Sequence, residues 1–331
     1  MTKPLRAAMI GCGRIARRHA AVMTALEGVH LAGCCDHKAE NAAAFSQEFG
    51  GIRAYTDCEA MFAELGLDIV YICLPPFAHG NEVDLAGQHG VHFLIEKPIA
   101  LTMERALHMA DAVKASGVKS QVGFMFRHGE AVQWLRHQVC DKSRPAFMSG
   151  RYACNALHRR WWRDRRQSGG QLLEQVIHLL DMARYLLGEP VEVYAAQDNL
   201  FHRQMADYTI EDASSTVIRF DSGSLAVIAA TNGAIPGRWE SEWRVVQQNL
   251  TVDFSDSNHA VIWHTDRSPV ATKVIAAETD LFRAQALDLL AAIRDDRPTL
   301  APIEEGVRSL RLALAARHSA ETGMPVAIEK I

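Results

Sequence analysis

Residues 5–16, LRAAMIGCGRIA, decide the fold of the N-terminal part of the chain. The apolar run up to Ile10 is typical of a buried strand, and the residues after Gly13 predict a helix. A G-x-G-x-x-A pattern between a strand and a helix is the fingerprint of a dinucleotide-binding turn. In such a turn Gly11 permits the tight bend, Gly13 lets a pyrophosphate approach the backbone, and Ala16 keeps the helix close to the sheet.

The N-terminus of this helix is the second part of the predicted cofactor site. Free N–H groups and the positive end of the helix dipole favour a pyrophosphate there, so we count Arg14 and Ile15 with Gly11 and Gly13 among the cofactor-binding residues. Asp36 stands twenty residues beyond the pattern, at the end of the second predicted strand. A carboxylate at that place accepts hydrogen bonds from the ribose hydroxyls.

Asp36 favours NAD over NADP, because a carboxylate repels a 2′-phosphate. His37 and Lys38 follow immediately and could offer that phosphate positive charge, or they could form an ordinary solvated helix start. The sequence therefore predicts NAD and leaves NADP open.

Two domains are expected, the first over residues 1–123. In this domain short apolar runs alternate with longer amphipathic stretches, a pattern that predicts an α/β Rossmann domain with a doubly wound parallel sheet. Residues 124–331 predict an α+β domain, in which strand-period segments form a mainly antiparallel meander beside helices near 131–139, 171–187, 281–294 and 303–322. The strands expected in the first domain are Arg6–Ile10, His30–Cys35, Ile69–Leu74, His92–Ile95 and Lys119–Phe124. Those of the second cover residues 146–154, 192–197, 214–220, 224–231, 242–248 and 260–265.

Composition excludes several classes of protein. The 331 residues are 48% hydrophobic and 22% charged, as in ordinary globular proteins, and a net charge of −4 provides no basic field for nucleic acid. The sequence contains no apolar run long enough for a membrane span or a signal peptide. Seven cysteines, among them adjacent Cys34 and Cys35, lack metal-ligand spacing. We therefore expect free thiols and a cytoplasmic location.

Lys97 is a candidate catalytic residue by its position. The sequence Glu96-Lys97-Pro98 follows the fourth predicted strand, at the carboxyl edge of the sheet where ligands of open α/β folds bind. A lysine there can face a substrate, although an ordinary surface lysine at a strand end is equally compatible with this position.

His178 is the second candidate. In the helix predicted over residues 171–187, Gln171, Glu174, His178 and Asp181 project to one side. A carboxylate four residues before a histidine can orient its imidazole for acid/base work. A satisfied core or surface histidine is the alternative. Glu174, His178 and Asp181 could also ligate a metal, but no second ligand cluster stands out, and we expect no metal.

Five motifs together resemble the glucose-fructose oxidoreductase/inositol dehydrogenase/MocA family. They are GCGRIA (11–16), CLPPFAH (73–79), EKPIAL (96–101), GFMFR (123–127) and GGQLLEQVIHLLD (169–181), and the likeness continues through 306–326. The resemblance implies an NAD(P)-dependent dehydrogenase of a sugar, polyol or sugar derivative. It also implies an open, mainly antiparallel C-terminal sheet with helices on one face, whose other face assembles a homo-dimer or homo-tetramer.

The family's functional positions carry over as follows. Lys97 and Glu96 belong to the E-K-P motif, and His178 matches the acid/base histidine, with Glu174 beside it in the substrate site. Further residues would border the nicotinamide or touch the cofactor, namely Leu74, Pro75, His79, Trp162 and Arg163. Arg127 and Asn155 are weaker candidates for contacts with other substrate hydroxyls. Three departures leave the substrate open: Ser168 replaces a glycine, Glu174 an aspartate and Phe282 a tyrosine that many members have.

In the predicted reaction His178 accepts the hydroxyl proton, while Lys97 stabilises the developing alkoxide. The basic segment 158–166 could select an anionic substrate, or it could be an exposed loop with aromatic residues packed beneath it. Two other functions remain alternatives: a nucleotide-sensing protein of this fold without turnover, and a dehydrogenase of a non-sugar substrate.

Overall fold

The structure is a computed structural model, and it describes residues 4–139, 145–155 and 159–329. The chain divides into two compact units, Met1–Met125 with Asp280–Val307, and Phe126–Thr279 with Arg308–Ile331. Residue 158 of the basic segment and Cys140 lie outside the described residues. In the described ranges no helix is long and apolar enough to cross a membrane.

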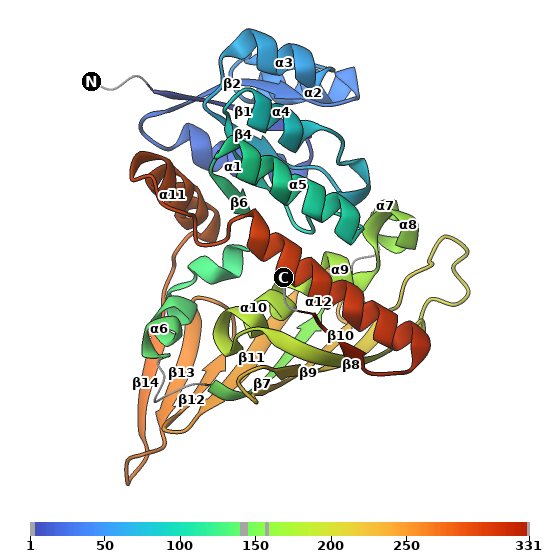
Figure 1. Cartoon of the computed structure of the whole chain (residues 1–331), viewed down its shortest axis with the longest axis vertical. Helices are drawn as coiled ribbons and strands as arrows, with labels where there is room; N and C mark the ends of the chain where they lie inside the picture. Colours follow the sequence, from blue (N-terminus) through green and yellow to red (C-terminus); the bar gives the residue numbers. More distant parts are fainter. Residues whose placement is uncertain (1–3, 140–144, 156–158, 330–331) are drawn as a thin grey trace. The chain divides into compact units, whose positions relative to one another are not determined.

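The first unit is built on a six-stranded sheet in the order β3-β2-β1-β4-β5-β6, in which all neighbours are parallel (Figure 1). This confirms the predicted doubly wound fold, and the order reverses between β1 and β4, where such folds bind ligands. Its strands are β1 (Leu5–Ile10), β2 (Val29–Cys35), β3 (Arg53–Tyr55), β4 (Ile69–Ile72), β5 (His92–Ile95) and β6 (Ser120–Val122). Its helices include α1 (Arg14–Thr24), α2 (Ala39–Glu48), α3 (Cys58–Leu65), α4 (Glu82–Gln88) and α5 (Met103–Ser116).

Helix α11 (Leu281–Arg294) belongs to this first unit although it lies late in the sequence. The Asp280 carboxylate caps it by accepting hydrogen bonds from the N–H groups of Phe282 and Arg283. Ala286 packs on Val22 of α1, and Leu289 joins the core of the unit. By sequence, this helix falls within the predicted second domain, residues 124–331.

A nine-stranded sheet forms the second unit, in the order β14-β13-β12-β11-β7-β10-β9-β8-β15. Every neighbouring pair is antiparallel except β7 and β10, which confirms the mainly antiparallel prediction. The strands are β7 (Pro145–Ala153), β8 (Pro190–Asp198), β9 (Ala213–Phe220), β10 (Leu225–Thr231), β11 (Glu240–Gln247), β12 (Leu250–Phe254), β13 (His259–His264), β14 (Ala271–Ala276) and β15 (Val326–Ala327).

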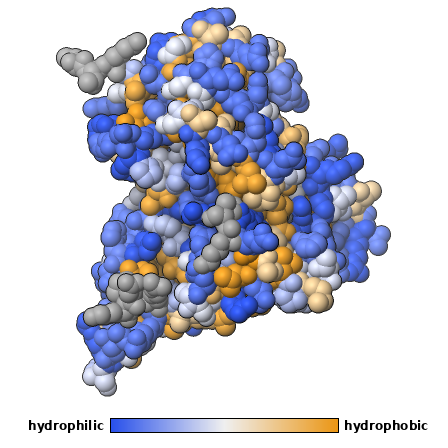
Figure 2. Space-filling view, viewed as in Figure 1, coloured by the Kyte–Doolittle hydropathy of each residue, from blue (hydrophilic) through white to orange (hydrophobic). Residues whose placement is uncertain are grey.

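Helices cover one face of this sheet and leave the other open. Helices α6 (Glu130–Gln138), α10 (Ile177–Leu187) and α12 (Ile303–Thr322) lie along the covered side (Figure 1). Exposure alternates along the strands accordingly, so that Ile218 of β9 is buried while the next side chain towards the start of the strand, Val217, is 44% exposed. On the side of the molecule seen in Figure 2, hydrophilic residues cover most of the surface.

The helix predicted over residues 171–187 is two helices, which corrects the prediction. Helix α9 (Gln171–Glu174) makes a single turn, and α10 begins only at Ile177. The break is a local change in hydrogen bonding, because the Val176 N–H reaches back five residues to Gln171 O at 3.0 Å. The polar side predicted for this helix is also buried, since Gln171, Glu174, His178 and Asp181 are each at most 7% exposed.

Candidate active site

The glycine turn after β1 has a geometry that only glycine permits. Gly11 adopts a φ of +84°, and a Cβ atom there would lie 2.7 Å from the Cys73 carbonyl oxygen, which ends β4. The Gly11 N–H donates to Cys35 O at the end of β2, at 2.8 Å. The turn is thereby fixed at the carboxyl edge of the sheet, next to the point where the strand order reverses.

The start of α1 leaves room for a phosphate group. Gly13 is its N-cap, no side chain caps the helix, and a Cβ built on Gly13 meets nothing within 4 Å. Open space therefore adjoins the first N–H groups of an eleven-residue helix, which is the arrangement that favours an anion. These residues fit the pyrophosphate of a dinucleotide.

Asp36 ties the glycine turn to the end of β2. Its carboxylate accepts hydrogen bonds from the N–H groups of Cys12 at 2.9 Å and Lys38 at 3.0 Å, and from the Asn41 amide at 3.3 Å. The neighbouring His37 ring is 3.4 Å away but 81% exposed. The carboxylate thus stands at the predicted ribose position, with its orientation held by the backbone.

Glu96 is turned into the interior of the first unit. Its carboxylate lies 2.9 Å from Nε2 of the buried His19, a residue of α1, and also accepts the Lys97 N–H at 3.2 Å. Lys97 itself is half-buried after β5. The His19–Glu96 contact links the phosphate-binding helix to the E-K-P turn. His19 was not predicted from the sequence. Its position three residues after the glycine pattern could have indicated that it lies near the cofactor site.

His79 follows the short turn η1 (Pro76–Ala78) after β4. Both of its ring nitrogens are buried, and among the described residues neither has a hydrogen-bond partner. Burial, together with the nearby positive charge of Arg105, lowers the pKa of His79 to about 4. The ring is therefore neutral near pH 7. Leu74 and Pro75, just before it, are half-buried and offer apolar surface at the same edge of the sheet.

His178 and Glu174 are both buried in the second unit. His178 stands in the first turn of α10, is 6% exposed, and packs its ring on Phe126 with a centroid distance of 4.8 Å. Glu174 ends α9 and is 7% exposed. Burial and the negative charge of Glu174 raise the pKa of Tyr152 on β7. The Glu174 carboxylate and the Tyr152 phenol therefore interact in a water-poor region, where charges act strongly on each other.

Asp181 does not join this group. It forms a two-pronged ion pair with Arg127, at 2.8 Å and 2.7 Å, and accepts a hydrogen bond from Ser309 of α12. The Arg127 guanidinium is almost fully buried and lies 4.7 Å from the Tyr185 ring centroid. This geometry favours a role for Arg127 in supporting α10 over the substrate contact predicted for it. Asn155 is half-buried, and its amide donates to Ala234 O at 3.3 Å.

Several arginines of the basic segment form ion pairs with acidic residues of the same unit. Within α7 (Arg160–Arg163), Arg163 approaches the Asp207 carboxylate at 3.4 Å, while Trp162 contacts Trp239 edge-on at 5.8 Å. Two further arginines pair with acids, Arg165 with Glu211 and Arg166 with Asp164, and Arg159 and Arg160 are exposed. Among the described residues no group of three or more His, Cys, Asp or Glu side chains could hold a metal ion.

Comparison with known proteins gives matches over nearly the whole chain. An oxidoreductase family with an NAD-binding Rossmann fold matches residues 5–124, and the C-terminal alpha/beta domain of that family matches residues 146–328. The UDP-N-acetylglucosamine 3-dehydrogenase of Acidithiobacillus ferrooxidans is 30% identical, over 96% of this chain and 97% of that protein. The scyllo-inositol 2-dehydrogenase (NAD(+)) of Bacillus subtilis is 24% identical, over 99% and 98%.

Solved structures show the same fold. A levoglucosan dehydrogenase in complex with NADH and L-sorbose superposes with a TM-score of 0.89 over 100% of both chains, at 19% sequence identity. The family matches cover both halves of the chain, and the parallel sheet of the first unit and the mainly antiparallel sheet of the second agree with the two domains of that family. This chain belongs to the glucose-fructose oxidoreductase/inositol dehydrogenase/MocA family of oxidoreductases with an NAD-binding Rossmann fold.

Proposed function

We propose that this protein is an NAD(P)-dependent dehydrogenase that oxidises a hydroxyl group of a sugar, a polyol or a sugar derivative. The observation that carries the proposal is the pairing, in one chain, of a phosphate-binding turn with a buried acid/base segment, Glu174 to His178. The relatives named above support the substrate class, because their names specify a nucleotide sugar and an inositol.

A bound nicotinamide would supply the hydride acceptor. Within the chain, His178 accepts the hydroxyl proton through its imidazole, whose ordinary pKa near 6.5 suits proton exchange at neutral pH. The Glu174 carboxylate orients and polarises that ring, and the Lys97 ammonium stabilises negative charge on the substrate oxygen. Burial of His178 and Glu174 strengthens these interactions, because little water competes with them.

The cofactor contacts that we propose come from the phosphate turn, the ribose carboxylate and the carboxyl edge of the sheet. They are Gly11, Gly13, Arg14, Ile15, Asp36, Leu74, Pro75 and Lys97, with Trp162 and Arg163 from the second unit. Glu96 and His79 act from the interior, since Glu96 is held by His19 and the His79 nitrogens are buried. Asp36 makes NAD the preferred cofactor.

In this proposal residues 1–123 form the dinucleotide-binding domain, while residues 124–331 bind substrate and assemble a homo-dimer or homo-tetramer. The open sheet face supports the assembly, because apolar side chains stand exposed on it. These include Phe147, Tyr194, Val217, Leu225 and Val227. A cytoplasmic location completes the proposal, because the reduced cofactor must be reoxidised by other enzymes.

A substrate panel tests the proposed activity. Polyols, aldoses, glycosides, sugar acids, nucleotide sugars and non-sugar alcohols are each mixed with NAD or NADP, and reduced nicotinamide is followed by its absorbance. We expect turnover with at least one of these compounds, and faster turnover with NAD. Cofactor binding without any reduction would instead support a nucleotide-sensing protein. Turnover with non-sugar alcohols alone would support a dehydrogenase of a non-sugar substrate.

A charge on the open face tests the assembly. Val217→Arg places a cation among the exposed apolar groups of β9, so we expect the mass measured by light scattering to fall to that of one chain. Lys114→Glu, a charge change at an exposed position of α5 in the first unit, is the control for a changed surface charge. An unchanged mass for Val217→Arg would contradict this interface.

A further inference from the structure

Helix α9 is too short, and lacks the side-chain cap, to be stable by itself. It has one turn, Gln171–Glu174, and its N-cap, Gly170, has no side chain to bond the free N–H groups. A single helical turn is unstable alone, because nucleation is costly. Yet this turn carries Glu174 and leads directly into His178, so its placement decides where both side chains lie.

The missing cap comes from Glu211, which lies before β9, in the loop that follows β8. Its carboxylate accepts the Leu172 N–H at 2.8 Å, although the two residues are 39 positions apart in the chain. The Gln171 N–H is a further hydrogen-bond donor to the same group. Glu211 therefore bonds two of the N–H groups at the start of α9, as an N-cap side chain would.

The residues around Glu211 provide space and hydrogen-bond donors for a buried carboxylate. Its side chain is 1% exposed, and the Arg165 guanidinium lies 3.1 Å away. Gly170 has a φ of +104°, and a Cβ atom on it would lie 2.6 Å from a Glu211 oxygen. The carboxylate thus occupies the space that the glycine leaves. Burial raises the pKa of Glu211, while Arg165 and the two N–H groups act in the opposite direction.

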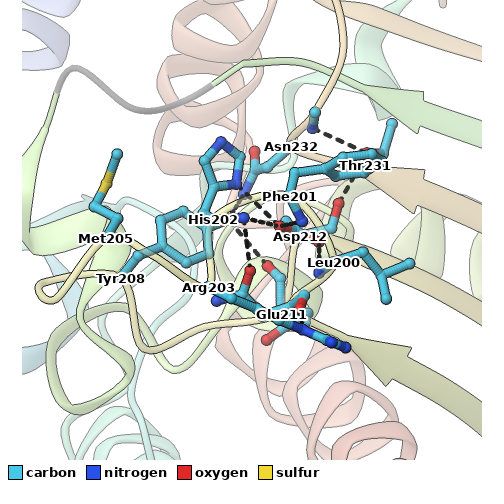
Figure 3. A network of polar contacts seen from close by, with 12 residues as sticks. Leu200, Phe201, His202, Arg203, Met205, Tyr208, Glu211, Asp212, Thr231 and Asn232 are labelled. Atoms are coloured by element: carbon cyan, nitrogen blue, oxygen red, sulfur yellow. Dashed lines mark hydrogen bonds and ion pairs between the residues drawn. The ribbon is translucent and has the colours of Figure 1, made fainter.

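Asp212, the next residue, faces a different part of the molecule. Figure 3 shows its carboxylate among the backbone of Leu200 and Phe201 and the His202 ring. It accepts the N–H groups of Leu200 and Phe201 at 2.7 Å each, and lies 2.9 Å from His202 Nδ1. Asp212 is fully buried, like Glu211, but its carboxylate bonds its own loop, at Leu200, Phe201 and His202.

We infer that Glu211 is a positioning residue for the Glu174–His178 segment, acting through the start of α9. This inference rests on the proposed function, in which those two side chains act on the substrate. The loop before β9 thereby controls the geometry of the reaction without touching the reacting atoms. A displacement of about 1 Å in such groups can cost as much as about a hundredfold in rate.

The matched pair Glu211→Gln and Asp212→Asn tests this inference. Both replace a buried carboxylate by its amide at neighbouring positions. In Glu211→Gln the Leu172 N–H retains an oxygen acceptor, but Arg165 loses the closer of its two acidic partners and keeps Glu321 at 4.0 Å, so we expect the protein to fold and α9 to shift. We expect kcat to fall by about tenfold or more, and the pH profile of kcat to move, with NADH affinity unchanged.

In Asp212→Asn, a comparable loss of thermal stability should accompany a kcat within about twofold of the parent and an unmoved pH profile. Glu211→Asp is the intermediate variant. It keeps the charge but is one methylene shorter, so its kcat should lie between those of the parent and Glu211→Gln. Equal losses of kcat in Glu211→Gln and Asp212→Asn, in proportion to stability, would overturn the inference.

A second measurement does not need the substrate. The His178 imidazole, assigned by comparison with His178→Asn, is titrated by NMR in the parent and in both amide variants. We expect its titration to shift in Glu211→Gln and to stay unchanged in Asp212→Asn. An unmoved His178 titration in Glu211→Gln refutes the positioning role. A panel without turnover, in contrast, refutes the proposed function and leaves this result to be judged separately.

Discussion

The glycine turn of the first unit and the α9–α10 segment of the second are held in place by different means, although one carboxylate, Asp36, also bonds the turn. The turn relies on backbone contacts, such as Gly11 N–H to Cys35 O, and on the absence of a side chain at Gly11. The α9–α10 segment depends on buried charged side chains from other parts of the chain, Glu211 at its start and Arg127 on Asp181.

This difference has a physical cause. A phosphate needs N–H groups at close range, which a strand, a turn and a helix in succession can supply. An acid/base pair needs defined side-chain positions in a water-poor interior, and each buried polar group there requires a partner. Substitutions in the two regions should therefore fail in different ways.

The largest effect is expected for His178→Ala. Removal of the proton acceptor should lower kcat by about 10²- to 10⁴-fold, while NADH affinity stays near that of the parent because the phosphate turn is intact. Steady-state kinetics and NADH fluorescence titration measure the two quantities. Lys97→Ala is the companion variant: if it abolishes the pH dependence of kcat while His178→Ala retains it, Lys97 is the proton acceptor instead.

Arg127→Met tests the support of α10. It leaves the Asp181 charge buried with its guanidinium removed, so the free energy of unfolding should fall by about 3–5 kcal/mol. Arg127→Met combined with Asp181→Leu should recover most of that loss. For comparison, Arg53 pairs with Glu64 at the surface of the first unit, and Arg53→Met should cost less than about 1 kcal/mol. Urea denaturation distinguishes these cases, and equal losses for the two single variants would contradict the contrast.

The sequence predicted those parts of the molecule that are encoded by neighbouring residues. The strand, turn and helix around Gly11 follow from short-range pattern, and so does the alternation along β9 (Ala213–Phe220). Four strands were missed, namely β3, β12, β14 and β15. Two of them have weak patterns, because β3 is short and largely exposed and β14 has four exposed residues of six. Short strands of this kind are defined by pairing with a neighbour rather than by periodicity.

Contacts over long distances in the chain could not be predicted in the same way. The helical periodicity of residues 171–187 continues through the break after Glu174, so the sequence predicted one helix. Asp181 shares a face of that predicted helix with His178, and only the structure shows that it pairs with Arg127. The return of α11 to the first unit depends on packing against α1. One signal was available for the cap of α9: two adjacent acids, Glu211 and Asp212, stand directly before the alternating pattern of β9.

His79 extends the comparison to pH, because it is a buried titratable group without a partner in the first unit. Its pKa is lowered to about 4, so the unfolded chain binds a proton more readily than the folded one between pH 6.5 and 4. Stability should therefore decrease as pH falls through this window, by up to about 3 kcal/mol. His79→Phe should remove that part of the decrease, as measured by urea denaturation at pH 7, 5.5 and 4.

A histidine of the second unit, His259, should change the pH dependence of stability in the opposite direction. A hydrogen bond with Asp256 raises the pKa of His259, so its small stabilising contribution is present at low pH and is lost as pH rises. The free energy of unfolding of His259→Gln should therefore be lower than that of the parent at pH 5 and nearly equal to it at pH 8.

The outcome that would contradict the His79 prediction is a pair of parallel stability curves against pH for the parent and His79→Phe. Such curves would show that His79 does not titrate differently in the folded state.

A moderate effect, and the one that tests the turn most directly, is expected for Asp36→Ala. The carboxylate would bond the ribose hydroxyls of NAD and repel the 2′-phosphate of NADP, so NAD affinity should fall by about tenfold while NADP affinity stays the same or improves. The Cys12 N–H also loses its acceptor, which could weaken both cofactors. Asp36→Asn separates the two causes, because its amide oxygen can still accept from Cys12 but carries no charge. Fluorescence titration with NADH and NADPH measures both affinities for each variant. Equal losses for the two cofactors in Asp36→Ala, absent in Asp36→Asn, would assign Asp36 to holding the glycine turn alone and would leave the choice between NAD and NADP to other residues.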